Sequence, residues 1–350
     1  QGKQNKPKWR NHIMPTRQTF ALMRPKEQYD KVVKQRERDG MSFFEKYNFQ
    51  FVEVLCPVCG VLGNYIFEKY GFKHKKCEIC KTLFCSPRPT ENLLGTYYNS
   101  FDAPRMWTEI LLQTDVNRKS LQYQPRVDKI ISLIQKSGHN SCGTALDLGA
   151  GSGAFAMCLE NTSFFGSVLA LDLSDDCIKV CKNNGLNALR GSIADMDSNS
   201  VDLICINDLI EHVFDPSSFL RECYRVLRLG GYVSIATPNG EGFDFKIMKE
   251  RTMNITPPEH LNYFNPDSLV QFLSKKGFHL VSVETPGMLD VEIVQQAKIS
   301  GFPLEERNEY LTYLLEQGDE ILGNFQRFIS ENKLSSHMLI LAKKNQEGYL

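Results

Sequence analysis

The stretch LDLGAGSGAFAMCLE, residues 146–160, places three glycines within five positions between an apolar run and a run with helical spacing. Strand, glycine loop and helix in this order are typical of a doubly wound α/β sheet, which binds ligands at the carboxyl ends of its strands. Glycines suit such a loop because the backbone turns sharply and approaches the ligand without intervening Cβ atoms. The stretch therefore predicts an α/β fold with a ligand site directly after this strand.

Apolar runs and amphipathic runs alternate downstream of this loop, which predicts a largely parallel sheet with helices on both faces. The expected strands are TALDLGA (144–150), SVLALDL (167–173), VDLICIN (201–207), GYVSIATP (231–238), HLVSVET (279–285) and HMLILAKK (337–344). The expected helices are DDCIKVCKNN (175–184), PSSFLRECYRVLR (216–228) and PDSLVQFLSKKG (266–277). Residues 288–333 have helical character and form an expected insertion before the last strand.

The charge of the 350-residue chain is balanced, with 41 basic and 41 acidic residues, so no global field favours nucleic acid or membrane. No apolar run approaches the roughly 20 residues of a membrane span, and we expect a cytoplasmic protein without a membrane partner. Helical spacing recurs at 108–116 and 126–138, with Pro125 as an expected break. The expected parts are a basic arm (1–50), a cysteine module (51–90), a helical linker or lid (91–142) and a ligand-binding domain (143–350).

Two carboxylates help to choose between ligands for the glycine loop. Gly149, Gly151 and Ala154 also satisfy the loose dinucleotide pattern, so a nicotinamide dehydrogenase remains an alternative. Asp147, two residues before the first loop glycine, would repel a pyrophosphate but suits a cation. Asp172 ends the next expected strand, where a carboxylate can hold the two hydroxyls of a ribose. The favoured ligand is a nucleoside that carries positive charge.

These residues resemble class I S-adenosylmethionine-dependent methyltransferases, which have a seven-stranded sheet with an antiparallel last strand. The resemblance covers roughly residues 143–344 and rests on DLGAGSG, LALDLS, SVDLICINDLIEHVFDP, FLRECYRVLRLGGYVSIATPN and PPEHLNYFNPDSLVQFLSKKGF. The resemblance implies that the three loop glycines lie against the methionine and ribose parts of S-adenosylmethionine and that Asp172 binds the ribose. Many relatives have an Asp beside the adenine where this chain has Ser192 and Ile193, so a backbone amide near Ile193 is expected there. The implied cofactor-binding set is Asp147, Gly149, Gly151, Gly153, Asp172, Ile193 and Asn207.

Four polar side chains, Asp208, Glu211, His212 and His260, follow expected strands and should lie on the rim of the cofactor pocket. Such a group fits a general base with an orienting carboxylate, or a divalent-metal site. Small-RNA 2′-O-methyltransferases and some ubiquinone-pathway O-methyltransferases have a similar carboxylate-x-x-Glu-His pattern, and this resemblance implies a metal that binds and acidifies a hydroxyl. A third interpretation is that Glu211 and His212 only order the loop.

Four cysteines, Cys56, Cys59, Cys77 and Cys80, form two Cys-x-x-Cys pairs separated by seventeen residues, which is the spacing of a four-thiolate zinc site. We expect a structural zinc because the protein fills all four positions. Some sugar C-methyltransferases and glycan methyltransferases have a similar module followed by SPRPT and YYNS segments. This resemblance adds Tyr97, Tyr98 and Trp107 as candidate pocket residues.

The sequence thus predicts an S-adenosylmethionine-dependent methyltransferase with a zinc module. The preferred acceptor is a hydroxyl of a small polar metabolite such as a sugar or nucleotide-sugar, whose phosphates the basic N-terminal segments would contact. A sulfonium methyl is already activated, so positioning supplies much of the acceleration. One alternative is an RNA ribose 2′-O-methyltransferase with a second, divalent metal at the Asp208, Glu211, His212 and His260 cluster. Another alternative is a non-catalytic binding module on the same fold.

Overall fold

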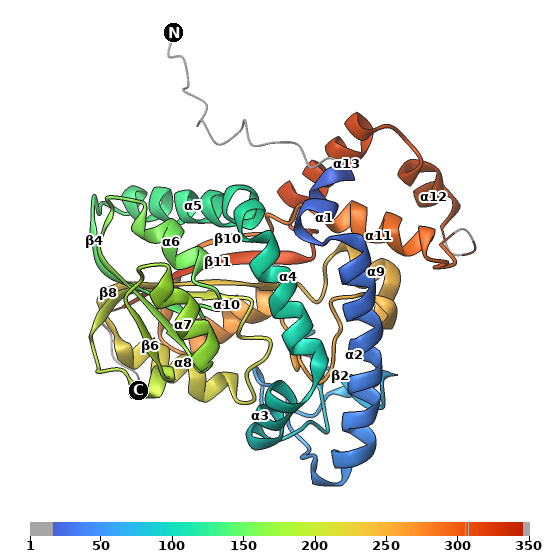
Figure 1. Cartoon of the computed structure of the whole chain (residues 1–350), viewed down its shortest axis with the longest axis horizontal. Helices are drawn as coiled ribbons and strands as arrows, with labels where there is room; N and C mark the ends of the chain where they lie inside the picture. Colours follow the sequence, from blue (N-terminus) through green and yellow to red (C-terminus); the bar gives the residue numbers. More distant parts are fainter. Residues whose placement is uncertain (1–16, 305, 307, 346–350) are drawn as a thin grey trace.

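The computed structural model describes residues 17–304, 306 and 308–345, and its centre is a seven-stranded sheet (Figure 1). The strand order is β10, β11, β8, β7, β4, β5, β6. Strands β8 to β6 run parallel, whereas β11 is antiparallel to both β8 and β10. The expected α/β sheet with an antiparallel last strand is confirmed. The strands are β4 (Cys142–Leu148), β5 (Phe165–Asp172), β6 (Ala188–Arg190), β7 (Val201–Asn207), β8 (Leu227–Pro238), β10 (Phe278–Glu284) and β11 (His337–Lys344).

Strand β6 was missed by the sequence pattern because it has three residues, of which only Ala188 is buried. A strand this short has no apolar alternation from which it could be recognised. The other strands of the central sheet lie within a few residues of their expected positions.

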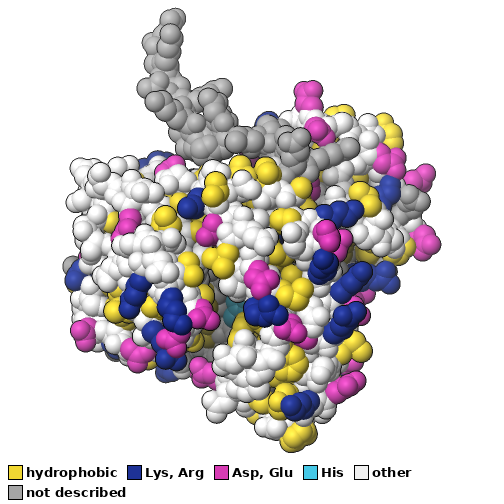
Figure 2. Space-filling view, in the orientation of Figure 1, with side chains coloured by type: hydrophobic (Ala, Val, Ile, Leu, Met, Phe, Trp, Pro, Cys, Tyr) yellow, Lys and Arg dark blue, Asp and Glu magenta, His cyan; other side chains and the backbone are white. Residues whose placement is uncertain are grey.

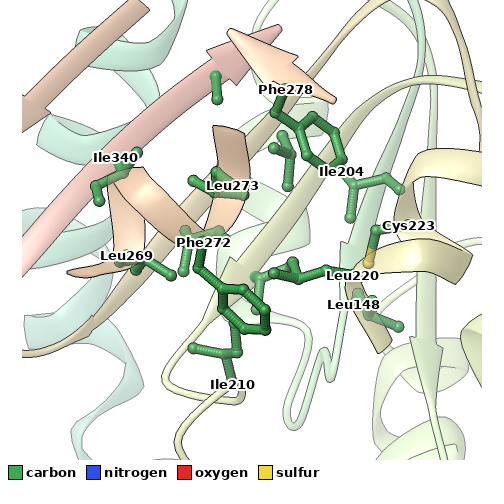
Figure 3. Packing of buried hydrophobic residues seen from close by; sticks show 14 of the residues in the cluster. Leu148, Ile204, Ile210, Leu220, Cys223, Leu269, Phe272, Leu273, Phe278 and Ile340 are labelled. Carbon is green, nitrogen blue, oxygen red and sulfur yellow. The ribbon is translucent and has the colours of Figure 1, made fainter. Parts of the chain in front are cut away.

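Two apolar layers cover the faces of the sheet, as the alternation predicts. One layer comes from α5 (Gln124–Lys136), α6 (Ala154–Glu160) and α7 (Asp175–Asn183). On the other face, α8 (Pro216–Val226) and α10 (Pro266–Lys275) pack Leu220, Phe272 and Leu273 against the sheet residues Leu148 and Ile204 (Figure 3). Each of these last two helices begins with a capping side chain followed by a proline, Asp215 before α8 and Asn265 before α10, which fixes where the helix starts.

A long helical segment leads into the sheet and is continuous across Pro125. Helix α4 (Asp102–Arg118) passes through a π turn (Lys119–Tyr123) directly into α5. Proline has no N–H to donate, and here it lies in the first turn of α5 after the widened turn. Where a break was expected, the helix therefore continues and only its turn becomes wider. Helices α1 (Arg17–Met23), α2 (Lys26–Tyr47) and α3 (Glu91–Ser100) complete this part, while residues 1–16 of the expected arm lie outside the described residues.

The cysteine module forms a second, four-stranded sheet in the order β1, β2, β3, β9. The first three strands are β1 (Asn64–Lys69), β2 (Phe72–Lys76) and β3 (Leu83–Cys85). The fourth, β9 (Asn262–Tyr263), comes from the segment between β8 and α10 of the central sheet. The module is therefore joined to the rest of the fold by a shared strand.

The expected insertion contains α11 (Asp290–Ile299), α12 (Glu309–Leu315) and α13 (Asp319–Glu331), which lie beside α1 and α9 (Phe243–Met248) in Figure 1. Apolar residues of α1, α2, α4, α9 and the insertion share one core cluster. Among the residues that the structure describes, no helix combines the length and the apolar character needed to span a bilayer.

Candidate functional site

The glycine loop after β4 has three glycines in the left-handed region, with φ of 76°, 54° and 80° at Gly149, Gly151 and Gly153. A Cβ added at Gly149 would lie 3.0 Å from Leu209, and one at Gly153 would lie 2.4 Å from Leu186. Within the described part of the chain, a Cβ at Gly151 would meet no atom within 4 Å. The outer glycines therefore permit close packing, and the middle one exposes backbone to open space where a ligand can approach.

Asp172 at the end of β5 is fixed beside this loop. Its Oδ2 accepts a hydrogen bond from the Gly151 N–H at 2.9 Å, and its Oδ1 accepts one from the Ser174 N–H at 2.8 Å. Each carboxylate oxygen can accept a further hydrogen bond, so both remain able to accept from a pair of ribose hydroxyls. The two motifs that the sequence paired, the glycine loop and Asp172, are in direct contact.

Asp147 and Asn207 bring unsatisfied polar atoms to the same place. Neither Oδ2 of Asp147 nor Nδ2 of Asn207 has a hydrogen-bond partner among the described residues, although both atoms are buried. Burial raises the pKa of Asp147 to about 7. Buried polar atoms without partners are costly, and a ligand that carries a cationic amino group would satisfy the carboxylate. These atoms fit the amino-acid end of S-adenosylmethionine.

Arg126, which the sequence analysis did not single out, contacts Asn207 and is a further candidate site residue. It lies in α5 with 7% of its surface exposed, and its Nη1 donates to Asn207 Oδ1 at 2.6 Å. A guanidinium has five N–H donors in a planar fork, which suits a carboxylate ligand. The residue was missed because it belongs to the helix before β4, outside any local motif.

Ile193, the expected neighbour of the adenine, begins a 3-10 turn (Ile193–Asp195) that is capped by Ser192. Its side chain is buried in the apolar layer that also contains Leu148 and Leu171. The expected contact uses a backbone amide of this turn, and it stays a prediction.

The structure brings together three of the four residues of the expected cluster. One ligand atom each of Glu211, His212 and His260 lies within 4.8 Å of the other two. The two imidazole rings meet edge to face with centroids 4.6 Å apart. Glu211 and His212 follow β7, and His260 precedes β9, so this cluster lies where the central sheet meets the cysteine module.

Asp208 is not part of this group. Its backbone adopts a left-handed φ of 49°, and its Oδ1 lies 2.8 Å from Nε2 of His337, the first residue of β11. Partial desolvation raises the pKa of Asp208, whose side chain is 43% exposed, but His337, Arg126 and Arg118 outweigh it and hold this pKa well below its usual range. His337 was missed by the sequence analysis because it joins the site only through the pairing of β11 with β8.

The hydrogen bonds around the cluster determine which atoms face its centre. Nδ1 of His260 lies 2.8 Å from the Asn254 carbonyl, which can only accept, so Nδ1 carries the proton and Nε2 offers a lone pair. Nδ1 of His212 lies 2.8 Å from the Tyr98 hydroxyl. Glu211 accepts from the Thr237 hydroxyl at 2.8 Å through Oε2, while its buried Oε1 has no hydrogen-bond partner in the described residues.

Burial controls the charges of the cluster. It lowers the pKa of His212 and takes that of His260 well below the usual value, whereas it raises the pKa of Glu211 to about 8. Neutral imidazoles accept protons and bind metals. The arrangement therefore suits a general base, and it also suits a divalent cation, since the His260 Nδ1–H donates to a carbonyl in the manner of metal-bound histidines.

A buried ion pair supports the loop that carries His260. Arg36 of α2 donates to both carboxylate oxygens of Glu259 at 3.0 and 2.8 Å, and the Tyr97 hydroxyl lies 3.4 Å from the same carboxylate. The Arg36 guanidinium also lies 4.9 Å from the ring centre of Trp107. Of the three aromatic residues expected in the pocket, Tyr98 contacts the cluster and the other two support this ion pair. Figure 2 shows histidine surface at the bottom of a hollow on this face.

The four cysteines of the module converge as their spacing predicts. One sulfur from each of Cys56, Cys59, Cys77 and Cys80 lies within 4.8 Å of the others. Each pair forms a tight turn that ends in a left-handed residue, with Gly60 N–H donating to the Cys56 carbonyl and Lys81 N–H donating to the Cys77 carbonyl. The four thiols fit a tetrahedral ion such as zinc.

The central part of the chain is similar to known methyltransferases. The family model described as a methyltransferase domain matches residues 146–235. A probable S-adenosylmethionine-dependent methyltransferase of Mycolicibacterium smegmatis is 27% identical over 151 residues, which cover 42% of this chain and 56% of that protein. A ubiquinone biosynthesis O-methyltransferase of Xylella fastidiosa is 26% identical over 174 residues, covering 45% of this chain and 68% of that protein.

Solved structures with a similar fold were also found. A methyltransferase structure from Archaeoglobus fulgidus, described as S-adenosylmethionine-dependent, has 19% identity and a TM-score of 0.41, and it covers 62% of this chain and 94% of that chain. The cysteine module lies outside the residues that match the family model. The chain spans little more than half the length of the Mycolicibacterium relative.

Replacement of Glu211 by Gln should change the pH dependence of stability. The pKa of Glu211 is raised to about 8 from its ordinary 4.5, so between these values the folded state keeps a proton that the unfolded state loses. Its contribution to stability is full below the lower value and is lost as pH rises through the higher one. We expect Tm, measured by calorimetry, to fall more steeply with pH in the wild type than in Glu211→Gln. Exposed Glu160→Gln is the control, and equal slopes for the wild type and Glu211→Gln would contradict the raised pKa.

Proposed function

We propose that this chain, which carries a class I S-adenosylmethionine-dependent methyltransferase domain, transfers a methyl group to a hydroxyl of a small polar acceptor such as a sugar or nucleotide-sugar. The observation that carries the choice of a hydroxyl is the pair of half-buried imidazoles of His212 and His260, which meet edge to face beside Glu211 and whose pKa values are lowered. An alcohol is a weak nucleophile and benefits strongly from a general base, whereas a neutral amine needs no proton removal before it attacks.

The cofactor side of the proposed site uses polar groups that have no hydrogen-bond partner or can still form a further hydrogen bond. Asp147 accepts from the ammonium group, Arg126 donates to the carboxylate, and Asp172 accepts from the ribose hydroxyls. When bound, S-adenosylmethionine supplies a methyl group on a sulfonium that is already activated. The protein therefore contributes mainly position and exclusion of water.

The acceptor side is formed by the loop after β7. Leu209 of this loop lies against Gly149 of the cofactor loop, so Glu211 and His212 are only a few residues from the cofactor cradle. We assign proton removal to His260 or His212, each through the ring nitrogen that faces the cluster. Glu211, which has one carboxylate oxygen within 4.8 Å of a ring nitrogen of each histidine, orients them. The cysteine module holds a structural zinc, because four thiolates leave no open position for substrate.

A second candidate is a divalent cation held by Glu211, His212 and His260, with an RNA ribose 2′-hydroxyl as the acceptor. The observation in its favour is the ligand set itself, two imidazoles and one carboxylate within 4.8 Å. In this case the cation acidifies the hydroxyl, and the histidines act as its ligands rather than as bases.

The first test is cofactor binding. Asp172→Ala should weaken S-adenosylhomocysteine binding by roughly 10- to 100-fold in calorimetry, because a charge-assisted pair of hydrogen bonds is lost. Asp176→Ala, in the first turn of α7 with 90% of its side chain exposed, is the control. Absence of binding to the wild type would leave the non-catalytic binding module as the better account.

The role of Arg126 is tested with two ligands that differ at one end. Arg126→Met should weaken S-adenosylhomocysteine roughly 10- to 100-fold and leave 5′-methylthioadenosine unchanged, because the latter lacks the amino-acid carboxylate. Exposed Arg105→Met is the control. Equal weakening of both ligands would mean that Arg126 supports the fold of the site and not the carboxylate.

The acceptor class is tested by screening nucleotide-sugars, free sugars and RNA for S-adenosylhomocysteine formation. We expect turnover of a sugar hydroxyl to fall roughly 100-fold or more in His212→Ala or His260→Ala. The increase of the rate with pH, which reports deprotonation of the general base, should also disappear. Metal analysis should give one zinc per chain, lost in Cys59→Ser. A Mn²⁺ site that disappears in His260→Ala, together with turnover of RNA, would favour the second candidate.

A further inference from the structure

Strand β9 is part of the cysteine module's sheet and also borders the cluster. Phe84 of β3 pairs with Asn262, and the Cys85 N–H donates to the Leu261 carbonyl at 2.9 Å. On the opposite side, the N–H groups of Leu261 and Asn262 both donate to the Glu211 carbonyl, at 2.8 and 3.1 Å. The segment that follows His260 is therefore hydrogen-bonded to β3 on one side and to the Glu211 loop on the other.

Arg88 reinforces the same connection from inside the module. This side chain is 1% exposed, and its Nη1 donates to Asn262 Oδ1 at 3.1 Å and to the Phe214 carbonyl at 3.2 Å. Asn262 in turn donates through Nδ2 to the Val213 carbonyl at 2.8 Å. Arg88 and Asn262 thus hold the ends of both loops that carry the cluster.

The cysteine turns are attached to the same region. The Cys80 carbonyl accepts from Nδ2 of Asn265, the residue that caps α10, and the Val58 carbonyl accepts from Lys275 near the end of that helix. The buried residues Cys56, Cys77 and Phe84 belong to the apolar layer that also contains Ile210. The contacts of both cysteine turns and of β3 therefore hold the segment between Asn262 and α10 in place.

The cofactor cradle shares this apolar layer through Leu148 and Ile193, but it also has a support of its own. Asp147, the glycine loop and Asp172 belong to β4 and β5, which pair with each other and with β6 and β7. Arg126 comes from α5, on the face of the sheet opposite to α10. Loss of order in the module should therefore reach the acceptor side before it reaches the cofactor side.

We propose that the metal-loaded cysteine module positions the acceptor side of the site, with Arg88 and Asn262 as the positioning residues. Zinc occupancy then determines the order of the Glu211, His212 and His260 cluster and leaves cofactor binding unaffected. This inference rests on the proposed function for the role of the cluster and for the identity of the ion. Arg88 and Asn262 belong to neither the cofactor cradle nor the cluster, and they act through the loops whose residues Val213 and Phe214 they contact.

The test uses the full chain in its zinc-loaded form and after zinc removal by a chelator. Hydrogen exchange followed by mass spectrometry should increase at least about tenfold at residues 209–214 and 256–263 on zinc removal, and remain unchanged at 146–153. S-adenosylhomocysteine affinity should change by less than about twofold. Arg88→Lys and Asn262→Ala, with zinc still bound, should reproduce the increase, and exposed Arg228→Lys is the control.

A spectroscopic measurement separates positioning from general stability. The pKa values of His212 and His260, followed by NMR with labelled histidine, should rise toward the ordinary value when the cluster opens to water. Exchange confined to residues 51–88, unchanged histidine titrations, or a chain that binds no zinc would each overturn the proposal. Failure of the wild type to bind S-adenosylhomocysteine would instead contradict the proposed function, and the exchange and NMR results would still decide the positioning role.

Discussion

The carbonyl oxygen of Glu211 accepts hydrogen bonds from two successive backbone N–H groups, those of Leu261 and Asn262, and much of the site depends on this pairing. It joins the loop after β7 to the segment before α10, which are far apart in the sequence. The same segment continues into β9 and thereby reaches the cysteine module. One backbone contact thus connects the central sheet, the cluster and the module, and the side chains of Glu211 and His260 face each other because of it.

Buried ionisable groups give the site an unusual balance of charge. The pKa of Asp147 rises to about 7 and that of Glu211 to about 8, while both histidines of the cluster stay neutral. A cationic ligand placed beside Asp147 would favour its ionised form, since an opposite charge lowers the pKa of a carboxyl group. Binding and ionisation are therefore linked at this residue, and the cluster remains able to take up a proton.

Local motifs were predictable from the sequence because their chemistry requires a fixed spacing. The glycine loop, Asp172 and the two cysteine pairs each depend on residues close in the chain, and the structure brings them together. Contacts between distant segments were not predictable: Arg126 reaches the site from the preceding helix, and His337 arrives with β11. Asp208 left the expected cluster because its left-handed backbone turns the side chain toward His337. The strand β9 has only two residues and no pattern of its own.

The π turn between α4 and α5 sets the relative direction of the two arginines near Asp208. Arg118 and Arg126 are eight residues apart, which in a regular α-helix of 3.6 residues per turn would leave their side chains about 80° out of line. The wider turn at Lys119–Tyr123 has more residues per turn and takes up most of this angle. Both guanidinium groups consequently act on the same carboxylate. A regular α-helix would align two residues seven apart to within about 20°, so the wide turn accommodates one extra residue and still keeps the two charges on the same side of the helix.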